Sequence, residues 1–104
     1  MNNALGMLGL VMKSGRMQCG QSVCDKLIKS GEAQLILIDA GASQGTRKAV
    51  TDACAYYNIP FRLIPAGALG QAIGRSGRMV AAITDKALSA RLNGMLQEAF
   101  TTID

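Results

Sequence analysis

The spacing of glycines in segment 14–43 is the feature that most constrains how this chain folds. Glycines at positions 15, 20, 31 and 41 separate stretches of regular pattern, and glycine adopts turn and helix-cap conformations at no steric cost. The stretch Gly20–Ser30 has helical periodicity, and the stretch Gln34–Ile38 is apolar on both faces. A helix joined by a tight turn to a strand with two buried faces predicts a layered α/β protein.

The same alternation of helix and strand continues along the whole chain, as judged from apolar spacing and turn residues. The expected helices are Asn2–Lys13, Gly20–Ser30, Ser43–Tyr57 with Ser43 as N-cap, Pro65–Ile73, and a last helix capped by Thr84 or Asp85 that reaches Ile103. The expected strands are Met17–Cys19 at an edge, Gln34–Ile38 and Phe61–Ile64 in the centre, and Met79–Ile83. The inward residues expected of the third helix are Ala49, Val50, Ala53, Cys54 and Tyr57. This order predicts a three-layer α/β/α sandwich.

Composition argues against several classes of protein. The chain has 104 residues, a net charge of +4 and no His, and its length suits one domain. The three cysteines, Cys19, Cys24 and Cys54, do not have the number or spacing of a usual zinc site. We therefore expect free thiols, no metal and no cofactor. The sequence shows neither a signal-peptide pattern nor a membrane-length apolar stretch, so a cytoplasmic protein with no membrane partner is expected.

Catalytic residues are not expected. Without His the commonest general base is missing, and the scattered carboxylates sit mostly where helix caps or solvated faces explain them. The stretch Gly41–Gly45 resembles a phosphate loop but lacks the spacing of the known nucleotide-binding motifs. A nucleotide- or small-molecule-binding enzyme is the least favoured class.

The cations are more informative by position than by number. Arg47 and Lys48 lie near the start of the third expected helix, where acidic residues usually offset the helix dipole. Arg75 and Arg78 lie in a glycine-bearing loop, and Lys26 lies in the second helix. These positions favour an anionic partner such as a nucleic acid, with an ordinary solvated surface as the alternative. The chain has only four aromatic residues, which argues against a base-stacking platform.

Several pieces of the chain, taken together in their order and spacing, carry a family resemblance. They are LGLVMKSGRMQCG, then Lys26, GEAQLILIDAGAS, TRKAVTDACAYYNIPF, LGQAIGR and VAAITD. From about Leu5 to Leu92 the chain resembles the kink-turn-binding ribosomal-protein superfamily of L-seven-Ae and L-thirty-e type, and within it the small bacterial YlxQ-type members. The combination of pieces is specific, although no single piece is.

The resemblance implies a single RNA-binding domain over residues 1–104, built as an α/β/α sandwich around a mixed four-stranded sheet. It also implies an RNA-binding edge where three loops meet at one end of the sheet. The residues of this sequence that match that edge, together with the cations beside it, are Gly20, Gln21, Ser22, Lys26, Gly41, Arg47, Lys48, Arg75, Arg78 and Met79.

Two positions depart from the family pattern. In kink-turn binders the first element reads G-x-N-E-x-x-K, and its Asn and Glu contact sheared G·A pairs. This chain keeps Gly20 and Lys26 but has Ser22 and Val23 between them, and Val23 cannot replace a carboxylate acceptor. The third loop is also more polar than is usual in kink-turn binders, which favours phosphate contacts over apolar packing.

The sequence therefore predicts a non-enzymatic RNA-binding protein that contacts structured RNA, kink-turn-like or ribosomal, through one loop edge. The alternative is a protein-interaction module of the same fold that has lost kink-turn recognition. Association with the ribosome or with a protein partner is compatible with both, and a monomer is expected.

Overall fold

Four strands form one mixed sheet with the spatial order β1-β4-β2-β3 in the computed structural model, which describes residues 3–99. The strands are β1 (Met17–Cys19), β2 (Leu35–Asp39), β3 (Phe61–Ile64) and β4 (Val80–Ile83). β4 runs antiparallel to both β1 and β2, and β2 runs parallel to β3. The expected mixed four-stranded sheet is confirmed.

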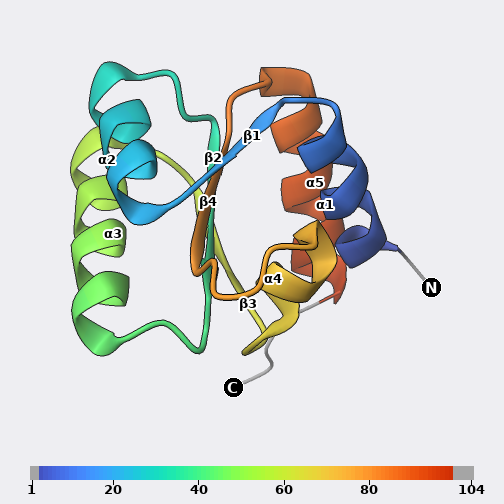
Figure 1. Cartoon of the computed structure of the whole chain (residues 1–104). Coiled ribbons are helices and arrows are strands. Elements are labelled where there is room, and N and C mark those ends of the chain that lie inside the picture. Colours follow the sequence, from blue (N-terminus) through green and yellow to red (C-terminus); the bar gives the residue numbers. More distant parts are fainter. Residues whose placement is uncertain (1–2, 100–104) are drawn as a thin grey trace.

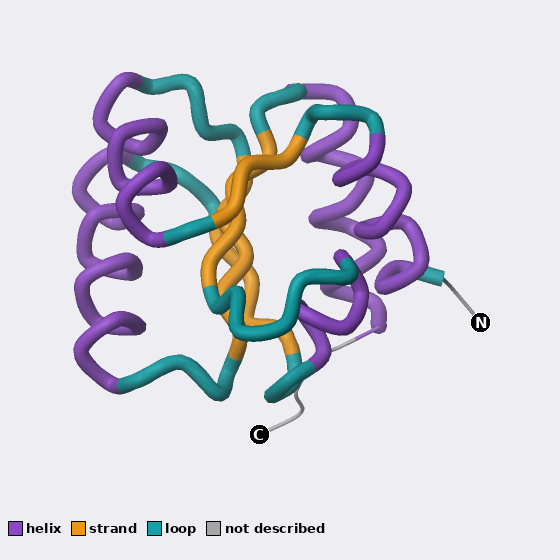
Figure 2. Tube along the Cα trace, viewed as in Figure 1, coloured by secondary structure: helices purple, strands orange, loops and turns teal. Residues whose placement is uncertain are grey.

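Five helices cover the two faces of this sheet (Figure 1). They are α1 (Ala4–Lys13), α2 (Gln21–Ser30), α3 (Gln44–Tyr57), α4 (Ala68–Ile73) and α5 (Lys86–Ala99). α2 and α3 lie on one face, whereas α1, α4 and α5 lie on the other (Figure 2). The expected α/β/α sandwich is therefore confirmed.

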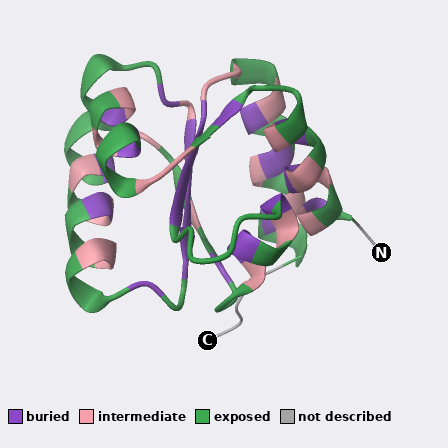
Figure 3. Ribbon diagram, viewed as in Figure 1, coloured by how far each residue is buried: buried purple, intermediate pink, exposed green. Residues whose placement is uncertain are grey.

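The core has two parts, one on each face of the sheet. One cluster joins α1, α4 and α5 to the sheet, and the other joins α2 and α3 to it. β2 and β4 are buried along their whole length (Figure 3), because each has a strand on both sides and helices over both faces. These two strands fix the position of every loop at their ends.

β3 is an edge strand, so its predicted central position is wrong. α2 and α3 pack over β2 and β4 and leave part of β3 uncovered, with Phe61 38% and Leu63 50% exposed. The neighbouring Tyr57 is also exposed, as is Ala49, so both are wrongly predicted as inward residues. Val50 and Cys54 are buried as predicted.

Other element boundaries differ by a few residues. α1 begins at Ala4, and α4 begins after Gly67, whose φ of 82° marks a left-handed turn, instead of at Pro65. β2 ends on Asp39, and β4 starts at Val80, which leaves Met79 in the preceding loop. The predicted end of the last helix at Ile103 lies outside the described residues.

Candidate nucleic-acid interface

The three loops matched by the family resemblance meet at one end of the sheet. The amide of Gly20, which precedes α2, donates to the carbonyl of Val80 over 2.9 Å, and the amide of Asp39 donates to the carbonyl of Met79 over 2.8 Å. The end of β1, the end of β2 and the start of β4 are therefore tied side by side. Figure 1 shows these turns on the same side of the molecule as the start of α3. We call this surface the loop edge, formed by segments 20–26, 39–48 and 74–79.

A buried carboxylate holds the turns of the loop edge in place. Asp39 is only 1% exposed. Its Oδ1 accepts hydrogen bonds from the amides of Gly41 (2.7 Å) and Gly67 (3.0 Å), and its Oδ2 accepts one from Leu69 (3.2 Å). Three charge-assisted bonds offset the cost of burying the carboxylate. The turn after β2 and the turn after β3 are thereby fixed to each other.

This role of Asp39 is one of the two expected of the carboxylates. Asp39 is buried and not on a solvated face, and it caps α4 from β2, because it accepts from the amide of Leu69 in the first turn of that helix. A Cβ on Gly41 would lie 3.0 Å from Asp39 Oδ1, so this internal contact favours glycine at the turn. An Asp that closes an apolar strand directly before a glycine turn is the sequence signal that could have indicated this carboxylate.

The starts of α2 and α3 lie next to each other and are joined by side chains. Ser43 caps α3 by accepting from the amide of Thr46 over 3.1 Å, as predicted. The hydroxyl of Thr46 donates to Gln21 Oε1 over 3.1 Å. Neither helix has an acidic residue in its first turn, so no carboxylate offsets the positive ends of the two helix dipoles. Thr46 was not among the predicted site residues.

A cleft of about 220 Å³ lies between these helix starts and the loop before β4. Gly20, Gln21 and Thr46 line one side, and Arg78 and Met79 line the other. Arg78 Nη1 lies 3.5 Å from the place a Cβ on Gly20 would occupy, so the guanidinium lies directly against the start of α2. A second pocket, of about 440 Å³, lies on the α4 side of the same loop.

The pKa of Cys19, at the end of β1, is affected by the positive charges of this region. Burial raises the pKa of the Cys19 thiol, whereas the guanidinium groups of Arg75 and Arg78 act to lower that pKa. Both arginines therefore act on the same small region. Burial raises the pKa of Cys24 to about 12 and that of Cys54 to about 11. All three cysteines are free, as predicted, and their raised pKa values keep the thiols protonated near neutral pH.

Lys26, Arg47 and Lys48 are not among the described residues that line the cleft. Lys26 is exposed on α2. Lys48 is turned along α3 toward Asp52, with 3.0 Å between Nζ and Oδ2. Arg47 is half-buried, and its Nε is buried without a hydrogen-bond partner among the described residues. The structure thus places Arg78 at the centre of the loop edge, with Lys48 directed away from it.

The two residues that depart from the family pattern both face solvent on α2. Ser22 is exposed, and Val23 is 42% exposed. Val23 is therefore an apolar side chain on the surface, at the position where the family pattern has a carboxylate.

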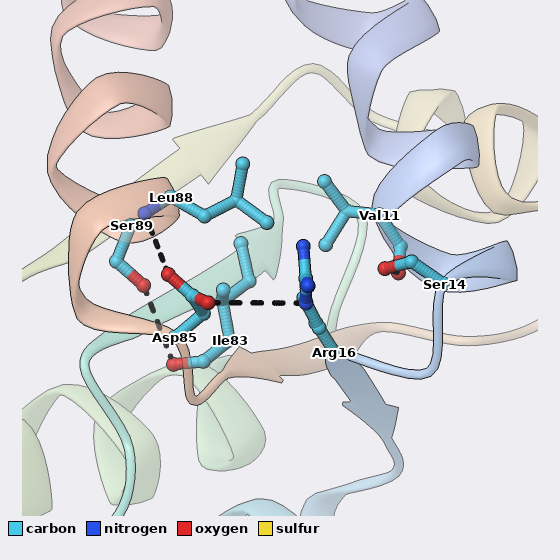
Figure 4. Close-up of polar contacts among 7 residues, drawn as sticks. All are labelled: Val11, Ser14, Arg16, Ile83, Asp85, Leu88 and Ser89. Atoms are coloured by element: carbon cyan, nitrogen blue, oxygen red, sulfur yellow. Dashed lines mark hydrogen bonds and ion pairs between the residues drawn. The ribbon is translucent and has the colours of Figure 1, made fainter.

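Arg16 lies at the opposite end of β4 from the loop edge. Its Nε is 3.8 Å from Asp85 Oδ2, and Asp85 Oδ1 accepts from the amide of Leu88 at the start of α5 (Figure 4). The hydroxyl of Ser89 donates to the carbonyl of Ile83 beside this pair. Asp85 is thus the predicted cap of the last helix, and Arg16 contributes nothing to the loop edge.

Within residues 3–99, no group of three or more His, Cys, Asp or Glu side chains is arranged to hold a metal ion. Among the described helices, none has the length and apolar character needed to cross a membrane.

The fold and its loop edge together define the class of protein: a small α/β/α sandwich of ribosomal-protein type. Residues 2–93 match the model of the family described as Ribosomal protein L7Ae/L30e/S12e/Gadd45. The chain belongs to this family, which confirms the resemblance seen in its sequence.

Two curated relatives carry the name RNA-binding protein YlxQ. The relative from Bacillus subtilis is 35% identical over 91 residues, which cover 86% of this chain and 91% of the relative. The relative from Enterococcus faecium is 27% identical over 95 residues, which cover 90% of this chain and 91% of the relative. Both support the predicted similarity to the bacterial YlxQ-type members and to binding proteins instead of enzymes.

Two solved structures share the fold. A protein of unknown function from Bacillus halodurans superposes with a TM-score of 0.87 at 26% identity, over 93% of this chain and 99% of that one. A 15.5 kD RNA-binding protein from Giardia lamblia superposes with a TM-score of 0.68 at 23% identity, over 96% of this chain and 93% of that one. The second likeness supports the fold alone.

Proposed function

We propose that this chain is a non-enzymatic RNA-binding protein that holds structured RNA against its loop edge. The observation that carries the proposal is the cleft in which Arg78 meets the starts of α2 and α3, with no acidic residue in the first turn of either helix. The two YlxQ relatives, named as RNA-binding proteins, support the same reading. A single domain over residues 1–104 and a cytoplasmic location stay predictions.

The binding mechanism follows from the groups at the loop edge. Backbone N–H groups at the start of a helix are suited to phosphate oxygens, and α2 begins after Gly20 with no side-chain cap on its first turn. Arg78 lies beside them, and Arg47, Arg75 and Lys26 lie elsewhere on the loop edge. Contacts of this kind fix an RNA backbone in position without reading its sequence, and they weaken steeply as salt increases.

The choice between a kink-turn-like RNA and another structured RNA depends on α2. A sheared G·A pair presents guanine donors, and an apolar Val23 offers these donors no acceptor. A lost acceptor in a buried contact costs about 1–3 kcal/mol, so we propose that a standard kink-turn is bound only weakly. Kink-turn-like and ribosomal RNAs that present mainly phosphates to α2 fit the loop edge equally well.

The test is a fluorescence titration of the whole chain against a standard kink-turn RNA and a duplex of equal length, at low and moderate salt. The double variant Arg47→Glu/Arg78→Glu is compared with Lys86→Glu/Arg91→Glu, which makes the same change of net charge at exposed positions of α5. We expect the first to lose at least about 30-fold in affinity, from two charge-assisted contacts, and the second to lose little. Equal losses from both variants would contradict the loop edge as the binding surface.

A further variant tests the two positions of α2 that differ from the pattern of kink-turn binders. Ser22→Asn/Val23→Glu restores the pattern of kink-turn binders on an exposed stretch of α2. We expect this variant to gain about tenfold for the kink-turn relative to the duplex, because the carboxylate returns an acceptor to guanine. No change in that ratio would mean that these positions do not face the RNA.

A second candidate function is supported by exposed aromatic residues away from the loop edge. Tyr56 is 79% exposed and stacks edge-on with Tyr57, with 4.9 Å between ring centroids, and Phe61 and Leu63 follow on β3. Exposed Tyr and Phe are typical of protein interfaces. A protein-interaction module would purify free of nucleic acid, which absorbance at 260 and 280 nm reveals readily in a chain with two Tyr and no Trp. Light scattering of the same sample tests the predicted monomer.

A further inference from the structure

The fold holds one side-chain amide of the loop edge in a defined orientation. The Ser43 hydroxyl donates to Thr46 Oγ1 over 3.1 Å, and the Thr46 hydroxyl donates to Gln21 Oε1 over 3.1 Å. Because the carbonyl oxygen of Gln21 is engaged, its NH₂ group is the part of the amide left for a ligand. This amide lies in the cleft beside Arg78.

We propose that Gln21 is a specificity-determining residue that donates a hydrogen bond to an acceptor of the bound RNA, and that Thr46 is the residue that positions it. The inference rests on the proposed RNA-binding function and adds the chemistry that the cleft selects. The bond from Thr46 joins residues 25 positions apart in the chain. It has no capping role for Gln21, and it ties the Gln21 amide to the start of α3 on one side of the cleft.

The absence of carboxylates from the cleft decides what the ligand must bring. No Asp or Glu is among the described residues that line the cleft. The three loop segments contain two carboxylates: Asp39 has both oxygens occupied by backbone amides, and Asp25 pairs with Lys29 along α2 over 2.9 Å. The Gln21 NH₂ group and the Arg78 guanidinium are therefore the unengaged donors at the cleft, with no carboxylate among the described residues beside them. A ligand that fits must carry acceptors on the atoms that enter the cleft.

RNA offers acceptors of this kind from two sources. They are the phosphate oxygens, which every nucleotide has, and base atoms such as N7 and O6 of guanine. Loss of a phosphate contact weakens binding to the same degree for every sequence, whereas loss of a base contact weakens binding only where that base is present. The two sources can therefore be separated with the same variant.

The experiment titrates the whole chain against hairpin RNAs that share one stem and have loops of guanosine, 7-deazaguanosine or uridine. Gln21→Met removes the amide while retaining its length, and Thr46→Val removes the hydroxyl while retaining the branched shape. Gln44→Met makes the same change as the first variant at the exposed first residue of α3. Each substitution replaces one uncharged residue with another, so the salt dependence of binding should not change.

We expect Gln21→Met to weaken binding by about fivefold and Thr46→Val by about twofold to threefold, as for the loss or loosening of one hydrogen bond. Gln44→Met should bind as the parent chain does. The acceptor is assigned to the base if two results agree. Gln21→Met must lose affinity only for the guanosine loop, and the parent chain must lose affinity to the same degree when that loop contains 7-deazaguanosine. An equal loss on all three loops assigns it to phosphate.

Two results would overturn the inference, and they are distinct from failure of the proposed function. If Gln21→Met binds every hairpin as the parent does, while Arg47→Glu/Arg78→Glu still loses affinity, Gln21 has no recognition role and the loop edge still binds RNA. If Gln21→Met loses affinity but Thr46→Val does not, the positioning role of Thr46 is wrong. Unchanged binding by the arginine variant as well would remove the proposed function itself.

Discussion

The two ends of β4 each bring an arginine beside the start of a helix, but the ends differ in one carboxylate. At the far end, Asp85 caps α5 through the amide of Leu88 and lies 3.8 Å from Arg16 (Figure 4). At the loop edge, Arg78 lies against Gly20 at the start of α2, which has no acidic residue in its first turn. An arginine beside a helix start is therefore offset by a carboxylate at the far end of β4, whereas at the loop edge it lines a cleft that has no carboxylate among its described lining residues.

This difference explains how a chain with a net charge of only +4 can have the local cationic surface that the proposed function requires. A carboxylate at a helix start offsets the dipole and pairs with a nearby cation. The far end uses both effects for local stability. The loop edge does have a carboxylate, Asp39, but the fold directs it inward to hold the turns. Both of its oxygens are occupied by backbone amides.

The largest effect is expected from Asp39, the buried carboxylate of the loop edge. Asp39→Asn replaces a buried carboxylate that accepts three amide bonds and should lower the free energy of unfolding by about 3 kcal/mol. Chemical denaturation measures this free energy of unfolding, and Asp52→Asn is the control. Asp52 is exposed and pairs only with Lys48, so this control should cost less than about 0.5 kcal/mol. Equal costs would show that Asp39 does not organise the turns.

The arginines give the next largest difference. Arg78→Gln should weaken RNA binding about tenfold through loss of a charge-assisted contact, whereas Arg16→Gln should leave affinity within about twofold, since its charge already faces Asp85. The slope of log affinity against log salt should fall by about one for Arg78→Gln only. A matching fall for Arg16→Gln would erase the distinction between the two ends.

The helix cap at the far end should have a smaller effect, on stability alone. Asp85→Ala removes the acceptor for the amide of Leu88 and should lower the free energy of unfolding by about 1 kcal/mol. RNA affinity measured on the same sample should not fall. A clear drop in affinity would place the far end in the binding surface.

The smallest effect is expected from adding an acidic residue to the first turn of α2, where the loop edge has none. Ser22→Asp adds an acidic residue to the first turn of α2 and should stabilise the fold by about 0.3–1 kcal/mol. The same change should weaken RNA binding severalfold, because the carboxylate opposes phosphate at the helix start. Stability and affinity should therefore move in opposite directions. If both rise, the start of α2 does not face phosphate.

Local signals in the sequence were sufficient for most of the fold. Gly20 and Gly31 bound α2, and Ser43 caps α3, as their residue types predict. What the sequence did not reveal depends on contacts across the fold. β3 reads as a central strand because its residues are apolar, and only the placement of α2 and α3 over β2 and β4 leaves Phe61 and Leu63 exposed.

The candidate site shows the same limit. Cations near turns were visible in the sequence, but which of them meet was not: Arg78 reaches the start of α2, whereas Arg16 reaches Asp85 instead. The bridge from Thr46 to Gln21 joins two helix starts that are distant in the chain. No local pattern encodes such a contact, because it depends on how α2 and α3 pack side by side.

The most direct test of the account maps the RNA onto the molecule by NMR. Amide resonances of the isotope-labelled whole chain are followed while a structured RNA is added. The account predicts shifts concentrated at Gly20, Gln21 and the loop around Gly77, with Arg16 and Leu88 unchanged. Shifts concentrated at the start of α5 or along Tyr56–Phe61, with the loop edge unaffected, would contradict it.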